Sequence, residues 1–139
     1  RVPVDSQGRM RSEAMPLLAG PTIVCIQAGN VNTGACDPFA EICERSHAGD
    51  AWVHVDGAFG LWAQIAPSTE SLAIGMNEAD SWATDFHKWL NVPYDSGIAI
   101  VRDAEALRAA MAITADYLPT SEFRNPSDFT PELSRRARR

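Results

Sequence analysis

A chain of 139 residues, of which 45% are hydrophobic and 22% charged, is long enough and apolar enough to fold as one globular domain with a real core. Its formal net charge of -6 argues against a broad nucleic-acid-binding surface. No apolar run approaches the roughly 18 residues that a membrane span requires. We therefore expect neither nucleic acid nor a membrane as a partner.

Both ends of the chain indicate a piece of a longer protein. The first residue is Arg1 rather than methionine, and the last five residues are RRARR. A basic tail for nucleic acid or targeting is the alternative interpretation of that run. An Arg-rich stretch within a longer chain is the interpretation that we favour.

The three cysteines are Cys25, Cys36 and Cys43, and no two of them have the C-x-x-C spacing. An odd number without that spacing argues against a disulfide framework or a zinc knuckle. Cys25 lies in the apolar run TIVCIQA, which predicts a small core residue. Together with the absence of a leader pattern, these features predict a reduced, cytoplasmic protein.

The first predicted elements are a strand, a loop and a helix. Residues 21–28, PTIVCIQA, form a β-branched apolar run that is typical of a buried strand. The polar, glycine-punctuated stretch 29–35 predicts a loop. Asp37 is expected to cap a helix whose first position is Pro38, and Gly49 is expected to end it in the left-handed conformation.

Strand and helix signals continue to alternate along the rest of the chain. Three further strands are predicted, at 51–56, 81–86 and 97–102, and residues 69–76 are weakly helical. Residues 103–113 favour a helix capped by Asp103, and the Pro-, Ser- and Asp-rich stretch from residue 116 favours a loop. This alternation predicts an α/β fold with a mostly parallel sheet. The last two strands are joined by a short segment without helix signals, so that pair can be antiparallel.

Polar clusters follow three of the predicted strands. They are Asn30–Thr33, Asp56, and the group Asp85, His87 and Lys88. In parallel α/β sheets, ligands bind at the carboxyl ends of the strands. The three clusters are therefore expected to converge on one site.

Phosphate-loop and metal chemistry are weakly supported. GNVNTG at 29–34 spaces two glycines as a P-loop does, but Ala35 and Cys36 replace the required lysine and hydroxyl residue. His54 and Asp56 share a face of one strand, and His87 could complete a metal site with them. One H-x-D and a distant histidine make a weak pattern, so no metal is predicted. No G-x-S-x-G motif is present.

Lys88 is the only lysine beside eleven arginines. It lies in TDFHKW, where Phe86 and Trp89 supply apolar surroundings that favour an uncharged, nucleophilic amine able to form a Schiff base. The alternative interpretation is a lysine that extends to the surface, as most lysines do.

Two motifs together resemble a known family. WVHVDGAFG (52–60), followed by DSWATDFHKWLNVPYDSG (80–97), resembles the cofactor core of group II pyridoxal-phosphate-dependent decarboxylases, the aromatic-L-amino-acid and glutamate decarboxylase superfamily. The flanking segments 30–42 and 115–119 resemble that family too. Its members are several times longer. The resemblance implies that residues 1–139 are part of a large domain of the aspartate-aminotransferase type (fold type I), with 113–139 as active-site loop and linker.

The resemblance also implies roles for single residues. Lys88 would hold pyridoxal 5'-phosphate as a Schiff base, His87 would lie by the phosphate, and Asp56 would pair with the pyridine nitrogen. Ala58 would pack beside the ring, and Tyr117 would reprotonate the substrate carbon. The implied activity is decarboxylation of an L-amino acid by a homodimeric enzyme. Another lyase or transferase that uses the same cofactor, and a non-catalytic fragment, are the alternatives.

Overall fold

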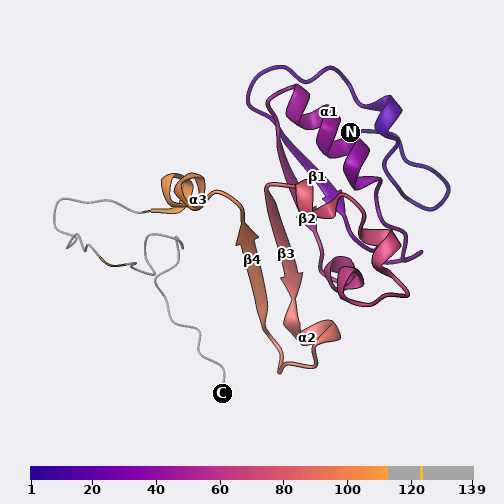
Figure 1. The fold of residues 1–139 in the computed structure, drawn as a ribbon, viewed down its shortest axis with the longest axis vertical. Coiled ribbons are helices and arrows are strands. Elements are labelled where there is room, and N and C mark those ends of the chain that lie inside the picture. The colour runs from indigo at the N-terminus through magenta and orange to yellow at the C-terminus, as the bar shows by residue number, and fades with distance from the viewer. Residues whose placement is uncertain (113–122, 124–139) are drawn as a thin grey trace. The chain divides into compact units, whose positions relative to one another are not determined.

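The computed structural model describes residues 1–112 and Phe123. The chain divides into two compact units, residues 1–100 and 101–139. The helices and strands are β1 (Ile23–Gln27), α1 (Phe39–Ala48), β2 (Trp52–Asp56), β3 (Ser81–Asp85), α2 (Phe86–Trp89), β4 (Gly97–Val101) and α3 (Ala104–Met111) (Figure 1). Short 3-10 helices lie at Ser12–Ala14, Gly60–Ile65, Glu70–Ala73 and Met76–Glu78.

The four strands form one sheet in the order β1-β2-β3-β4. β1 and β2 are parallel, and Gln27 lies opposite Asp56. β2 and β3 are also parallel, and Asp56 lies opposite Ala83. Figure 1 draws β4 in the direction opposite to β3. The predicted α/β fold with a mostly parallel sheet is thus confirmed, and so is the allowance for one antiparallel pair.

The core lies on one face of the sheet, beneath α1. Alternate residues of β1 and β2 point to this face, because side chains in a strand alternate between its two sides. They pack with the apolar side of α1 and with Met76. The buried residues of this contact are Val24, Ile26, Val53, Val55, Phe39, Ile42 and Cys43.

The opposite face of the sheet is open in the part of the chain that the structure describes. Ile23 is 67% exposed, and Cys25 and Asp56 are exposed as well. The prediction that Cys25 belongs to the core is therefore wrong. An unbroken apolar run predicts burial on both sides, but within the described residues only Val24 and Ile26 of β1 meet packing partners.

Asp37 does not cap α1 and instead joins two distant segments. Its Oδ1 accepts a hydrogen bond from the backbone N–H of Met10 at 2.6 Å, and its Oδ2 accepts one from Gln27 at 2.7 Å. The side chain is buried, so these bonds satisfy a carboxylate that would otherwise be costly there. Pro38 occupies the N-cap position of α1, and no side chain makes a capping hydrogen bond there. The helix ends at Gly49 with φ -102, so the expected left-handed conformation is absent at that residue and occurs at Asp50 instead.

The segment around Lys88 also differs from expectation. The strand predicted for 81–86 ends at Asp85, and one helical turn, α2, follows. Asp103 caps α3 as predicted, because its carboxylate accepts hydrogen bonds from the N–H groups of Glu105 and Ala106. Among the described residues, no helix is both long and apolar enough to cross a membrane.

Candidate active site

A pocket of about 730 Å³ opens on the uncovered face of the sheet. All four strands contribute to it, and α2 supplies one wall. Its polar side chains are Cys25, His54, Asp56, Thr84, Asp85 and Lys88, and its small residues include Ala58, Ala83, Gly97 and Ala99. The volume falls in the range of sites that hold small molecules and cofactors. Asp56 thus meets two members of the third predicted cluster, Asp85 and Lys88, in this pocket.

Lys88 lies on α2, and its amine contacts two groups. Its Nζ is 2.7 Å from Oδ2 of Asp85 and 4.1 Å from the centroid of the Phe59 ring. The hydrogen bond from Lys88 and its positive charge hold the pKa of Asp85 below the usual range of an aspartate, against an opposing effect of desolvation. The sequence indicated neither partner, because the i,i+3 contact with Asp85 requires the helical turn Phe86–Trp89, which was not predicted.

Asp56 ends β2, and its carboxylate is held by the turn that follows. Oδ1 accepts a hydrogen bond from the N–H of Ala58 at 3.1 Å. Gly57 donates its own N–H to the carbonyl of Ala83 at 2.8 Å. A Cβ on Gly57 would lie only 2.8 Å from that of Leu61, so this turn has no room for a larger residue. The backbone therefore sets the direction in which Asp56 enters the pocket.

A hydrogen-bonded chain fixes His54, which precedes Asp56 by two residues in β2 and also lines the pocket. The indole N–H of Trp52 donates to Oγ of Ser81 at 2.8 Å, and Nδ1 of His54 lies 2.8 Å from the same oxygen. Ser81 is buried, and donating its one proton to Nδ1 satisfies that hydroxyl. Neutral His54 then carries its proton on Nε2. Sequence reasoning placed His54 on the same strand face as Asp56 but gave it no role beyond a weak metal site.

His87 does not line this pocket. Its Nδ1 lies 2.8 Å from the carbonyl oxygen of Ser96 and 3.0 Å from the N–H of the same residue, and its ring meets the ring of Tyr94 at 4.5 Å. These contacts fix His87 to the segment before β4. Its predicted place by a phosphate stays a prediction. Tyr117 lies outside the described residues.

The cluster Asn30–Thr33 is held elsewhere. Asn30 accepts hydrogen bonds from the N–H groups of Asn32 and Thr33, and the hydroxyl of Thr33 donates to the carbonyl of Gln7 at 2.7 Å. These residues therefore shape a loop and do not join the pocket. Among the described residues, no group of three or more His, Cys, Asp and Glu side chains could hold a metal ion.

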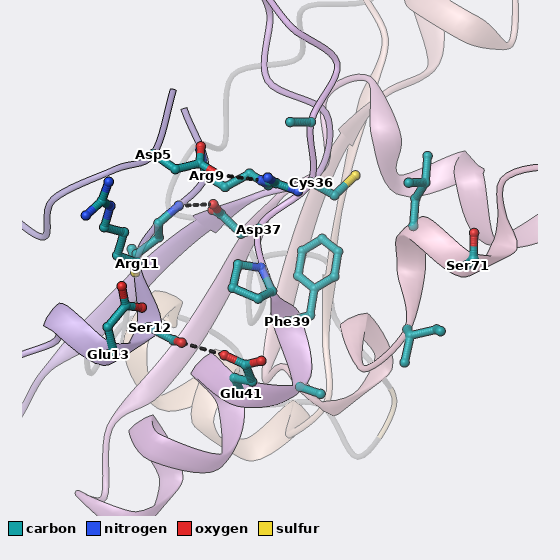
Figure 2. A pocket seen from close by; sticks show the side chains of 16 residues that line it. Asp5, Arg9, Arg11, Ser12, Glu13, Cys36, Asp37, Phe39, Glu41 and Ser71 are labelled. Carbon is teal, nitrogen blue, oxygen red and sulfur yellow. Dashed lines mark hydrogen bonds and ion pairs between the residues drawn. The ribbon is translucent and has the colours of Figure 1, made fainter. Parts of the chain in front are cut away.

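A second pocket, of about 650 Å³, lies between the N-terminal segment and the start of α1 (Figure 2). Several of its polar side chains are already paired. Arg9 bonds Asp5 at 2.8 Å, and the hydroxyl of Ser12 donates to Glu41 at 2.5 Å. The carboxylate of Asp37 also points into this region, where it accepts the backbone N–H described above (Figure 2). These contacts join the N-terminal segment to α1. The polar residues that line this pocket therefore have a structural role.

The family comparison decides the class of protein. The family model described as "Pyridoxal-dependent decarboxylase conserved domain" matches residues 9–139. The chain belongs to the pyridoxal-dependent decarboxylase family. Its resemblance to group II decarboxylases is therefore confirmed.

Curated relatives of this pyridoxal-dependent decarboxylase chain carry several names. An aromatic-L-amino-acid decarboxylase of Bacillus atrophaeus is 33% identical over 123 residues, which are 85% of this chain and 26% of the relative. An L-2,4-diaminobutyrate decarboxylase of Rhizobium meliloti is 35% identical over 135 residues, 91% of this chain and 26% of the relative. A 4-hydroxyphenylacetaldehyde synthase of Rhodiola rosea is 33% identical over 98% of this chain.

This chain also has the fold of solved decarboxylase structures. The structure of Oryza sativa TDC with PLP and tryptamine superposes with a TM-score of 0.74 at 29% identity. That match covers 83% of this chain and 24% of the rice chain. The pyridoxal-dependent decarboxylase chain thus spans about a quarter of the length of these relatives.

Proposed function

We propose that the full-length protein decarboxylates an L-amino acid with pyridoxal 5'-phosphate bound at Lys88. The observation that carries this proposal is that Lys88 and Asp56, far apart in sequence, line one pocket at the strand ends. Membership of the pyridoxal-dependent decarboxylase family supports it. The named decarboxylases among the relatives support amino acids as the substrate class.

The residues of the pocket fit this cofactor. Lys88 offers an amine to an aldehyde carbon, and Asp56 offers a carboxylate to a ring nitrogen. The alanines at 58, 83 and 99 leave a flat ring room to lie over the sheet. The volume of about 730 Å³ leaves additional space for a substrate.

When bound, pyridoxal phosphate supplies a protonated ring that accepts the electron pair left behind by carbon dioxide. The protein's own groups prepare and finish that reaction. Asp56 favours the protonated ring nitrogen through its negative charge, and its bond to Ala58 keeps the carboxylate in place. Lys88 anchors the cofactor. His87 contributes to phosphate binding, and Tyr117 returns a proton to the substrate carbon.

The side chain of the substrate is left open in this proposal. The names of the relatives include both aromatic amino acids and L-2,4-diaminobutyrate. Homodimerisation of the full-length enzyme and a cytoplasmic location remain predictions. Another lyase or transferase reaction on the same cofactor, and a fragment without activity, are the alternatives.

A second candidate is aldehyde formation. It is favoured by the 4-hydroxyphenylacetaldehyde synthase that matches 98% of this chain. Both reactions begin with loss of carbon dioxide in our proposal, and proton delivery, assigned above to Tyr117, separates them. The product therefore distinguishes the two candidates when carbon dioxide release alone does not.

The test is an assay of the full-length enzyme with pyridoxal phosphate and a panel of L-amino acids. We expect carbon dioxide and an equal amount of amine from at least one substrate. Lys88→Arg is expected to abolish both, because a guanidinium stays protonated and cannot act as the nucleophile. Aldehyde in place of amine would favour the second candidate. Carbon dioxide release by Lys88→Arg at the native rate would contradict the role of Lys88.

A further inference from the structure

The amine of Lys88 is held by a carboxylate at the wall of the pocket. Asp85 ends β3, and Lys88 follows three residues later on α2, so their ion pair spans the junction between strand and helix. Nζ lies 2.7 Å from Oδ2 of Asp85, and the ring of Phe59 covers Nζ at 4.1 Å. Asp85, Lys88 and Asp56 line the same pocket. The pair therefore lies where the cofactor would bind.

The surroundings restrict the Asp85 carboxylate. The side chains of Lys88 and Asp85 are 29% and 32% exposed, so both are partly shielded from water. Gly97, at the start of β4, approaches closely enough that an added Cβ would lie 3.3 Å from Oδ1 of Asp85. Because Lys88 holds the pKa of Asp85 below its usual range, the carboxylate is ionised at neutral pH. The ion pair between Lys88 and Asp85 is thus held in place by the junction between β3 and α2.

This arrangement opposes the chemistry proposed for Lys88. Only the uncharged amine attacks an aldehyde carbon, whereas a carboxylate within hydrogen-bonding distance favours the ammonium. Building on the function proposed above, we propose that Asp85 is a positioning residue that holds the amine of Lys88 in place in the cofactor-free enzyme and releases it when the cofactor binds. Asp85 thereby regulates cofactor loading.

The release step balances without another reactant. When Nζ bonds to the aldehyde carbon, the N–C bond forms, the carbonyl C–O bond breaks, and the oxygen leaves as water. Both protons of that water come from the ammonium nitrogen. One is transferred by way of the Asp85 carboxylate, which ends the step ionised, as it began.

The pair has a measurable cost for loading. The contact between Lys88 and Asp85 is lost when the cofactor takes the amine. Any stabilisation that the ion pair gives to the cofactor-free enzyme therefore weakens cofactor binding by the same factor. Partly exposed ion pairs change an equilibrium by about two- to fivefold.

The test is labelling of Lys88 in the full-length enzyme after removal of the cofactor. An amine-reactive reagent is applied at neutral pH, and the Lys88 peptide is quantified by mass spectrometry. We expect Asp85→Asn to raise the labelling rate of Lys88 by about two- to fivefold, because the amide carries no charge. Asp85→Glu restores a carboxylate and is expected to label as slowly as the native enzyme. Asp5→Asn removes an ion pair of similar length, to Arg9, and is the matched control.

Equilibrium titration with pyridoxal phosphate gives the second readout. Asp85→Asn is expected to bind the cofactor about two- to fivefold more tightly than the native enzyme, because no ion pair has to be broken. Unchanged labelling of Lys88 in Asp85→Asn, or weaker cofactor binding, would overturn the proposal. The labelling rate is measured without cofactor, so it tests the role of Asp85 independently of whether Lys88 binds pyridoxal phosphate. If added pyridoxal phosphate fails to protect native Lys88 from the reagent, the function fails and a raised rate in Asp85→Asn still supports the pairing.

Discussion

Lys88 and Asp56 reach the pocket from different elements, and the backbone places each of them. Asp56 is the last residue of β2, where the turn at Gly57 leaves no room for a side chain. Lys88 lies on a single helical turn directly after β3. At the scale of residues, the site is therefore an amine and a carboxylate at the ends of neighbouring parallel strands.

The carboxylate of Asp56 is expected to matter more for turnover than for cofactor binding. In the proposed site, Asp56→Ala would remove the charge that keeps the ring nitrogen protonated, and Lys88 could still capture the aldehyde. Losing a charge-assisted hydrogen bond of this kind costs about 1.5–3 kcal/mol, which corresponds to a decrease of about 10- to 150-fold in rate. Steady-state turnover and cofactor absorbance of the full-length variant measure the two effects. Turnover near the native level would show that Asp56 only shapes the turn.

At the scale of elements, glycines let segments approach one another closely. Gly75 precedes the 3-10 helix at Met76–Glu78 and has φ +81. A Cβ at this position would lie 2.5 Å from the backbone nitrogen of Ala40 and 2.6 Å from its Cα, both in α1. Neither backbone atom can move without displacing the helix that covers the core.

Gly75→Ala is therefore expected to destabilise the protein by about 2–5 kcal/mol, from left-handed strain together with overpacking. Gly20→Ala is the matched control, because Gly20 has φ +75 and nothing lies within 4 Å of its added Cβ. That control should cost only about 1–2 kcal/mol. Denaturant unfolding of the two full-length variants measures the difference. Equal losses of stability would refute the close contact with α1.

Much of the element order could be predicted from the sequence, and the errors have physical causes. All four strands and the helix capped by Asp103 lie where hydrophobic runs and capping residues predicted them. Asp37 was misassigned because a capping pattern before Pro38 does not reveal two backbone N–H donors from distant segments. Cys25 was misplaced because an apolar run cannot show which face is covered.

The site could be predicted only in part. The motifs identified Asp56 and Lys88, and the rule for strand ends brought them together. The ion pair with Asp85 and the ring contact with Phe59 were missed, because both depend on the turn α2 and on the fold after β2. The bond between His54 and Ser81 was also missed, since it joins strands whose register the sequence does not give.

At the scale of the whole molecule, the open face of the sheet is the main feature. Parallel sheets are normally covered on both faces. Here the described residues cover one face and leave the pocket, Ile23 and Cys25 exposed on the other. Because the chain spans 26% of the Bacillus atrophaeus relative, we expect further segments of a full-length enzyme to pack over this face and complete the pocket.

The central claim is that Lys88 bonds covalently to the cofactor, and one measurement tests it most directly. The full-length enzyme is loaded with pyridoxal phosphate, reduced with borohydride and digested, and the peptides are mapped by mass spectrometry. Because Lys88 is the only lysine in these 139 residues, a labelled lysine in any peptide from this region must be Lys88. We predict a pyridoxyl mass on that peptide, lost in Lys88→Arg. A label found only on other peptides, or no label at all, would contradict the account.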